Sequence, residues 1–293
     1  MSSLHLRPFQ YFEPASIHDA VELLNTCGDA AHILAGGVDL IPRLRTGAIS
    51  ADYIINIQNI PELNYIKCDG ADGLEFGAMA TLHALELSLE LRRGYPTLYD
   101  AIHNITSVQS KCMGTAAGNL CVATPSSDVA TALMALNGVL IIAGRSGARR
   151  ERIADFYTGY RRTTLKRGEL VIGVFVPKPA IGEMSTFLNL VRTHADCAKV
   201  AVAVSVLTDN GACKEARIAL GAVAPTVYRA DAAEKMLSGR ELNSEGIAAA
   251  AEAAAASTAP ITDLRSTADY RREMTKVLVG RALTKVAAKA GRN

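Results

Sequence analysis

Several features that would place a chain in a common functional class are missing from this sequence. Its 293 residues carry a net charge of only +2 at pH 7, so there is no basic excess to attract nucleic acid. None of the six cysteines forms a C-x-x-C pair, and no histidine lies beside one at metal-ligand spacing. We therefore expect reduced cysteines, no bound metal and no nucleic-acid partner.

Membrane and secretion signals are absent as well. The longest apolar stretches, Val129–Ala143 and Ala198–Leu207, are too short or too interrupted to cross a bilayer, and Asn137 and Gly138 break the first. Residues 1–14 include charged side chains and no apolar block, so no secretory signal is expected there. We expect a cytoplasmic protein that does not bind membranes.

Two glycine-bearing segments are the most informative features present. The first glycine segment is Leu34-Ala35-Gly36-Gly37-Val38-Asp39-Leu40, and the second is Gly114-Thr115-Ala116-Ala117-Gly118-Asn119-Leu120. Neither continues into the Gly-Lys-Ser/Thr of a Walker loop, and neither has the G-x-G-x-x-G spacing of a Rossmann turn. Because glycine leaves backbone N–H groups uncovered, each segment suits a phosphate. Together they predict two turns that clamp the pyrophosphate of a dinucleotide.

The N-terminal half is predicted to alternate strands and helices. Ser16 is expected to cap an amphipathic helix over residues 16–24. Thr81 is expected to open one helix that continues through Leu91. Further helices are predicted over 40–45, 97–105 and 129–136, and strands over 31–35, 53–57, 74–77, 139–143 and 170–176.

The stretch Pro177-Lys178-Pro179 is the best candidate for a domain boundary. We place a first domain at residues 1–178, with lobes at about 1–58 and 59–178, and a second domain at 179–293. A chain of this length can bury a separate core in each part.

After the boundary the pattern changes to strands followed by helices. Asp209-Asn210-Gly211 is a strong hairpin signal. The expected strands cover 185–193, 200–208 and 212–221, and the expected helices cover 229–237, 244–257 and 266–288. A small sheet followed by a helical layer predicts an α+β arrangement.

The ordered set of motifs resembles the FAD-binding medium subunit of the molybdenum hydroxylases, the family of xanthine dehydrogenase, carbon monoxide dehydrogenase and 4-hydroxybenzoyl-CoA reductase. The resemblance covers nearly the whole chain, whereas one glycine segment alone would be weak support. Besides the two glycine segments it rests on residues 124–128 (Thr-Pro-Ser-Ser-Asp), 159–163 (Gly-Tyr-Arg-Arg-Thr), 168–170, 196–200 and 263–271.

The resemblance implies an α+β chain with a two-lobed FAD-binding domain of the PCMH type and a C-terminal domain of antiparallel strands and helices. It implies that the two glycine segments wrap the FAD pyrophosphate, that Asp128 also contacts the cofactor, and that Val171 lies near the flavin ring. The cofactor-binding residues so assigned are Ile33, Leu34, Ala35, Gly36, Gly37, Val38, Asp39, Leu40, Thr115, Ala116, Ala117, Gly118, Asn119, Asp128 and Val171. No residue is assigned a catalytic or metal-binding role.

Some assigned residues also have simpler explanations. Asp128 follows two serines at a predicted helix start, where aspartate is favoured without any ligand. Val171 is an ordinary core residue by type. Thr115 and Asn119 add uncharged hydrogen-bonding groups beside the glycine backbone, which agrees with an anion site.

The sequence departs from the family pattern in several places. Val38 stands where the family often has threonine, and Ala117 where it usually has glycine. Leu188 and Asn189 stand where it often has a lysine close to the flavin, so a cation that would stabilise the reduced flavin anion is missing. No cysteine-bearing insertion follows Cys121, so the iron–sulfur loop of the 4-hydroxybenzoyl-CoA reductase branch cannot form.

The function implied is electron transfer. Electrons would leave a substrate at the molybdenum cofactor of a large partner subunit, pass through 2Fe–2S clusters of a small partner subunit, and reach FAD and then NAD or another acceptor. Two alternatives stay open. A flavin oxidase of the vanillyl-alcohol type would need its own base and a covalent flavin tether, for which no candidate is placed. A nucleotide sensor or scaffold would need neither.

Two polar clusters have no assigned role. His194, Asp196 and Lys199 are explained more simply by a turn between strands than by acid–base chemistry. A basic stretch over residues 161–167 could contact an acidic partner or the phosphates of a nicotinamide nucleotide, or form a solvated loop. Tyr157 and Tyr160 could stack on a flavin or fill the interface between lobes.

Overall fold

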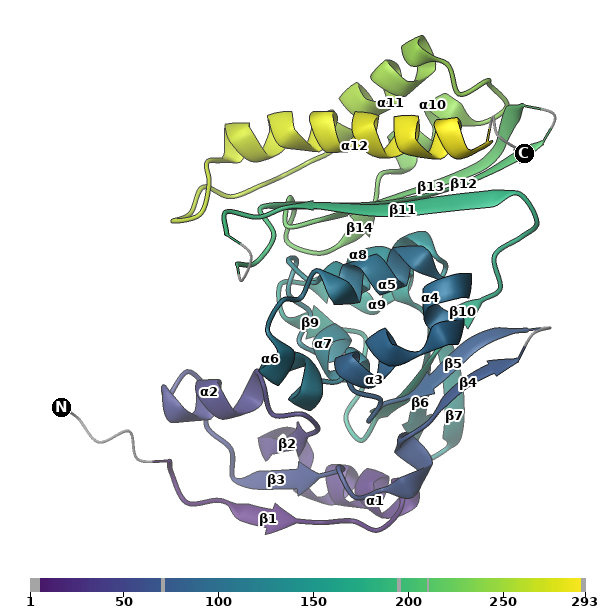
Figure 1. Ribbon diagram of the computed structural model, residues 1–293. Coiled ribbons are helices and arrows are strands. Elements are labelled where there is room, and N and C mark those ends of the chain that lie inside the picture. The colour runs from purple at the N-terminus through teal and green to yellow at the C-terminus, as the bar shows by residue number, and fades with distance from the viewer. Residues whose placement is uncertain (1–5, 70–71, 194–195, 210, 291–293) are drawn as a thin grey trace.

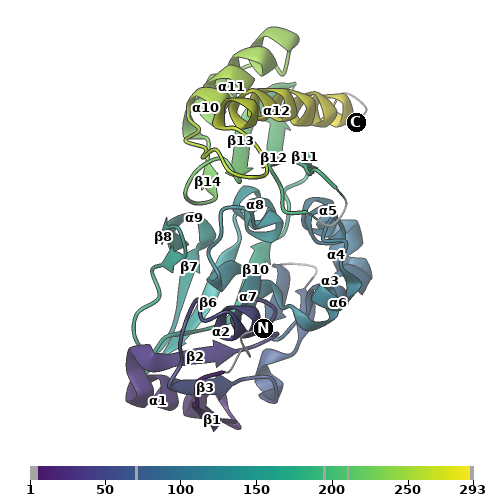
Figure 2. The same cartoon turned by 90° about the vertical axis from the view of Figure 1, so that its left-hand side faces the viewer.

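The computed structural model describes residues 6–69, 72–193, 196–209 and 211–290. They form three successive units, stacked from the bottom to the top of Figure 1 and in the same order in Figure 2. We call them the first lobe (β1 to β3), the second lobe (β4 to β10) and the C-terminal unit (β11 to α12). Each unit combines a sheet with helices, as the α+β prediction requires.

The first lobe is a small parallel sheet in the order β1-β3-β2. Ser16 caps α1 as predicted, because its side chain accepts the N–H of Asp19. The helix runs to Cys27 and ends where Gly28 adopts a positive φ of 65°. The elements are β1 (Gln10–Phe12), α1 (Ile17–Cys27), η1 (Gly28–Ala30), β2 (Ala31–Leu34), α2 (Leu40–Arg45) and β3 (Tyr53–Asn56).

The second lobe is a five-stranded antiparallel sheet in the order β4-β5-β10-β6-β7. Its central strand, β10 (Leu170–Pro177), is the last in sequence. The other strands are β4 (Ile66–Asp69), β5 (Gly73–Gly77), β6 (Val139–Gly144) and β7 (Gly147–Arg152), with a separate hairpin of β8 (Tyr157–Gly159) and β9 (Arg162–Thr163). The helices are η2 (Pro61–Leu63), α3 (Leu82–Leu87), α4 (Leu89–Gly94), α5 (Pro96–His103), α6 (Val108–Met113), α7 (Ala116–Cys121), α8 (Asp128–Ala135) and α9 (Ile153–Phe156).

The C-terminal unit is an antiparallel sheet in sequence order covered by three helices. Its elements are β11 (Glu183–Leu190), β12 (Val200–Asp209), β13 (Ala212–Gly221), β14 (Tyr228–Arg229), α10 (Asp231–Leu237), α11 (Ser244–Ala256) and α12 (Ala268–Ala290). The predicted hairpin joins β12 to β13, although its central residue Asn210 lies outside the described residues.

The central strands of this sheet are buried on both faces. Along β12, Val200, Val202 and Val204 pack in the core beneath α10 to α12. The alternate residues Ala201 and Ala203 belong to the core of the second lobe, because α8 packs against β12 and β13. Small side chains on that face allow the helix to approach, so the C-terminal sheet forms part of both cores.

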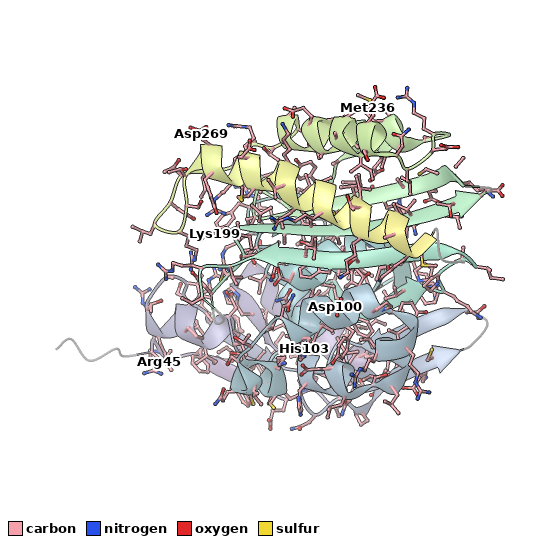
Figure 3. All side chains as sticks on the ribbon, turned by 45° about the horizontal axis from the view of Figure 1, so that its top comes forward. Arg45, Asp100, His103, Lys199, Met236 and Asp269 are labelled. Carbon is pink, nitrogen blue, oxygen red and sulfur yellow. The ribbon has the colours of Figure 1, made fainter. Side chains whose placement is uncertain are left out.

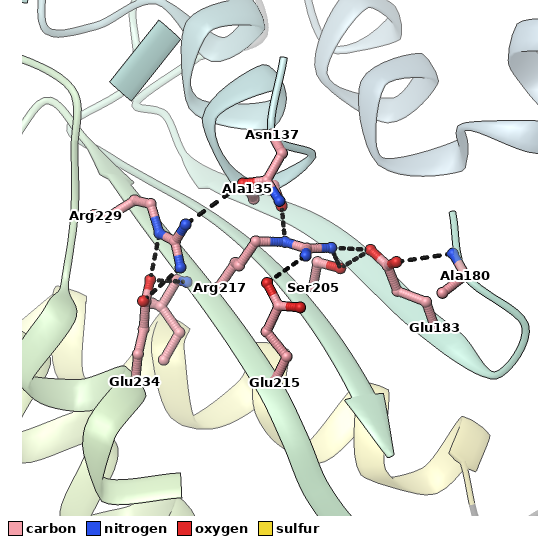
Figure 4. Close-up of polar contacts among 10 residues, drawn as sticks. Ala135, Asn137, Ala180, Glu183, Ser205, Glu215, Arg217, Arg229 and Glu234 are labelled. Atoms are coloured by element: carbon pink, nitrogen blue, oxygen red, sulfur yellow. Dashed lines mark hydrogen bonds and ion pairs between the residues drawn. The ribbon is translucent and has the colours of Figure 1, made fainter. Parts of the chain in front are cut away.

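A buried polar network joins the same two units (Figure 4). Arg217 on β13 donates through Nε to Ala135 O, at the C-terminal end of α8, at 2.8 Å. It also forms an ion pair with Glu183, and both side chains are only 8% exposed. Ser205 donates to the same carboxylate at 2.5 Å. The end of α8 is therefore fixed to the C-terminal sheet.

Two predicted helices break or begin at a different residue in the structure. The helix expected from Thr81 through Leu91 breaks at Ser88, which is extended (ψ 121°) and caps α4 by accepting the N–H of Leu91. The helix expected from residue 229 starts at Asp231, because Tyr228 and Arg229 pair with β13. No helix within the described ranges combines the length and apolarity that a membrane crossing requires.

Candidate functional site

The two glycine segments lie against each other in space. A Cβ built on Gly36 would stand only 1.9 Å from Met113 O and 2.9 Å from Gly114 Cα. Across the same contact, a Cβ built on Gly114 would lie 3.5 Å from Cγ2 of Val38. Backbone therefore meets backbone at this point, and no residue larger than glycine fits at position 36.

The first glycine segment joins β2 to α2. Ile33 and Leu34 end the strand, and Asp39 and Leu40 begin the helix. Gly37 has a φ of 72°, which side-chain-bearing residues rarely adopt. Among the hydrogen bonds between described residues, none is donated by the N–H groups of residues 36–38. This stretch can therefore donate to a bound anion.

The sequence predicts a turn at the second glycine segment, but in the structure this segment forms the start of a helix. Thr115 caps α7, and its hydroxyl accepts the N–H of Gly118 at 3.0 Å. A Cβ on Gly118 would lie 2.8 Å from that hydroxyl and would crowd the cap. Between described residues, the N–H groups of Thr115 and Ala117 donate no hydrogen bond, whereas Ala116 donates to Ala80.

The carboxylate of Asp39 is neutralised by two arginines. Arg161 donates through Nη2 and Nη1 to its two oxygens at 3.1 and 3.2 Å, and Arg43 donates at 3.2 Å. Burial alone would raise the pKa of Asp39, but the hydrogen bonds and charges of Arg161 and Arg43 outweigh it and lower the pKa below its ordinary value. Asp39 therefore stays ionised and paired.

Asp128 is the first residue of α8, but it does not cap the helix. Ser127 caps the helix by accepting the N–H of Ala130, and its hydroxyl donates to Asn119 Oδ1. Asp128 Oδ2 accepts from Asn189 Nδ2 at 3.0 Å, while its buried Oδ1 has no hydrogen-bond partner among the described residues. Burial raises the pKa of Asp128 to about 7, although the hydrogen bond from Asn189 opposes this shift.

Val171 and Tyr157 are both largely buried near α7. Val171 on β10 is 3% exposed and belongs to the core, and α7 packs against its strand. The hydroxyl of Tyr157 is buried without a hydrogen-bond partner among the described residues. Burial raises the pKa of Tyr157, with a smaller contribution from Cys121 at the end of α7.

The remaining polar residues do not form an acid–base cluster among the described residues. Asp196 pairs with Arg192 and Arg265, and His194 lies outside the described residues. Lys199, labelled in Figure 3, directly precedes β12, and its Nζ lies 5.8 Å from the ring centre of Tyr270.

The basic stretch is likewise engaged within the chain. Arg161 binds Asp39, and Arg167 donates to Asn25 O at 3.4 Å. These two side chains are therefore not a free cationic surface.

The chemistry of this region fits a dinucleotide pyrophosphate. Between described residues, N–H groups on two adjoining segments donate no hydrogen bond, and Thr115 and Asn119 place uncharged side chains beside them. By contrast, a surface hollow of about 290 Å³ lined by Phe9, Leu44 and others contains none of the predicted site residues. Among the described residues, no group of three or more His, Cys, Asp and Glu side chains is placed to hold a metal ion.

Two family models match the chain over most of its length. The FAD-binding domain of molybdopterin dehydrogenases matches residues 7–179, and the CO dehydrogenase flavoprotein C-terminal domain matches residues 185–286.

Individual relatives match across nearly their whole length. The carbon monoxide dehydrogenase medium chain of Afipia carboxidovorans is 34% identical and aligns over 96% of this chain and 98% of its own. The glyceraldehyde dehydrogenase medium chain of Sulfolobus acidocaldarius is 32% identical and aligns over 95% of this chain and 98% of its own. The solved carbon monoxide dehydrogenase of Hydrogenophaga pseudoflava superposes with a TM-score of 0.93 at 33% identity, covering 97% and 99% of the two chains.

Proposed function

This chain belongs to the FAD-binding medium subunits of the molybdenum hydroxylases, and on that premise we propose that it passes electrons from the iron–sulfur clusters of a small partner subunit to FAD and on to NAD or another acceptor. A large partner subunit would hold the molybdenum cofactor and the substrate. The single observation that supports this role most is the backbone contact between the two glycine segments.

We propose that the backbone of both segments holds the FAD pyrophosphate. The N–H groups of residues 36–38, Thr115 and Ala117 would donate to its oxygens, and Thr115 and Asn119 flank them with uncharged side chains. Asp128 would contact the cofactor through Oδ1, which has no partner in the part of the chain that the structure describes, and Val171 would form part of the apolar floor. The other members of this proposed set are Ile33, Leu34, Ala35, Asp39, Leu40, Ala116 and Gly118.

Bound FAD would supply the redox chemistry, and the protein would supply binding, orientation and electrostatics. Asn189 contributes a neutral amide, not a cation, beside Asp128. The substrate is proposed to bind on the large partner, so this chain needs no base or nucleophile of its own. Family membership favours this role over the self-contained oxidase. We also propose a cytoplasmic location, in which the six free cysteines would stay reduced.

Spectroscopy of the purified full chain tests the proposal. Flavin absorbance bands that bleach on addition of NADH without any substrate are the expected result. A chain that neither retains nor takes up FAD would contradict the proposed function. If the bands bleach only with a reductant other than NADH, the acceptor is not NAD. Purification of the native complex should recover two further subunits, one carrying iron–sulfur clusters and one carrying molybdenum.

A further inference from the structure

Arg161 links the two segments that form the proposed site. It lies between β8 and β9, and its guanidinium binds both oxygens of Asp39, a residue 122 positions away in sequence. Its backbone N–H donates to Ala123 O at 3.0 Å. Ala123 follows α7 closely, so one residue contacts both the start of α2 and the end of α7.

The position of Arg161 is fixed on several sides. Its φ of 55° and the φ of 51° at Ala123 lie in the left-handed region, which non-glycine residues keep only where their surroundings hold them. The guanidinium also stands 5.8 Å from the ring centre of Tyr160, whose side chain is 60% exposed. Arg161 itself is 28% exposed, so water screens its ion pair only in part.

The charge of Asp39 explains why such a residue is needed. Asp39 directly follows residues 36–38, whose N–H groups donate to no other described residue. A bare carboxylate there would repel the two negative charges of a pyrophosphate. Arg43 belongs to the same helix as Asp39 and cannot join separate parts of the chain, whereas Arg161 comes from the second lobe.

Building on the proposed FAD site, we propose that Arg161 is a positioning residue for the pyrophosphate. It cancels the charge of Asp39, so that no bare carboxylate stands beside the N–H groups of residues 36–38. Its role is to act through Asp39, without direct contact with the cofactor.

A double-mutant cycle on the full chain tests this role, with FAD affinity measured by fluorescence titration of chain freed of FAD. Arg161→Met should weaken FAD binding about tenfold or more, because Arg43 reaches only Oδ2 of Asp39 and Oδ1 is then left without a cation. Asp39→Asn should bind FAD more tightly than the wild type. Adding Asp39→Asn to Arg161→Met should restore affinity to within about threefold of the wild type. Arg152→Met is the matched control, since it removes a bidentate pair with Asp155 at the end of β7 and should leave the affinity unchanged.

The outcomes separate this inference from the proposed function. If wild-type chain takes up no FAD, the proposed function fails. If the wild type binds FAD and Arg161→Met binds it equally well, only the role of Arg161 is overturned. Should Arg161→Met not fold, Asp39→Asn is compared with the double variant. Similar affinities support charge cancellation, and a tenfold loss in the double variant contradicts it, because Arg161 would then bind the cofactor directly.

Discussion

At the scale of single residues, Gly36 leaves the least room for a side chain of all the described glycines. Gly36→Ala would drive a Cβ into the carbonyl of Met113 and push the two glycine segments apart. We expect a loss of stability of about 1–3 kcal/mol, as for other overpacked sites, together with weaker FAD binding. Chemical denaturation and FAD titration measure the two effects. Gly94→Ala is the control, because open space surrounds that glycine, and its stability should not fall.

Asp128 should make the stability of the FAD-free chain depend on pH. Its pKa rises from an ordinary 3.8 to about 7 on folding, so the folded state binds the proton more tightly than the unfolded state. The contribution of Asp128 to the free energy of unfolding is therefore most favourable below pH 4. As the pH rises to 7, this contribution falls by at most about 4 kcal/mol. Asp128→Asn should abolish that slope.

The matched control for this prediction is Asp269→Asn. Asp269 also lies in the first turn of a helix, but it is almost fully exposed. This variant should keep the wild-type slope in urea denaturation series between pH 4 and pH 7. If wild type and Asp128→Asn show the same slope over that range, the account of Asp128 is contradicted.

The sequence indicated some of these residues and could not indicate others. Gly36 and Asp128 stand in short motifs that can be recognised locally. The partners of Asp39 and Asp128 cannot be recognised in that way, since Arg161 is 122 residues from the first and Asn189 is 61 from the second. Such pairs depend on the folded arrangement of separate strands, for which a single sequence holds no local signal.

At the scale of elements, the strands and helices with clear periodicity were predicted well. The alternation along β12 and the cap at Ser16 both have strong local causes. The break at Ser88 was missed because residues 81–91 have good helix formers on both sides of it. The strand β7 was missed because its charged side chains, such as Arg149 and Glu151, form pairs on an exposed sheet edge.

The helix α8 should depend on Arg217 for its attachment to the C-terminal sheet. Arg217→Met leaves the carboxylate of Glu183 buried and uncompensated, so we expect a loss of about 3–5 kcal/mol. Adding Glu183→Gln should recover part of that loss. Urea denaturation of the full chain measures both.

An exposed pair provides the comparison for Arg217. Arg272→Met removes an ion pair with Asp269 on the surface of α12 and should change stability by less than about 0.5 kcal/mol. Equal effects of the two arginine variants would show that the buried network does not fix α8.

At the scale of the whole molecule, the units are not independent bodies. One face of the C-terminal sheet belongs to the core of the second lobe, and the other face packs beneath α10 to α12. Helix α8, which begins at Asp128, lies between the proposed cofactor site and this sheet. The domain boundary at residue 178 stays a proposal. Because the domains before and after it share buried surface, we expect them to unfold together.

The central claim, that both glycine segments grip the FAD pyrophosphate, is tested most directly by amide hydrogen exchange of the full chain with and without FAD. Bound FAD should slow exchange in peptides that contain residues 36–38 and 115–117, whose N–H groups would gain acceptors, and should leave α11 unchanged. If FAD binds and exchange in both peptides stays the same, the pyrophosphate is held elsewhere and the account is wrong.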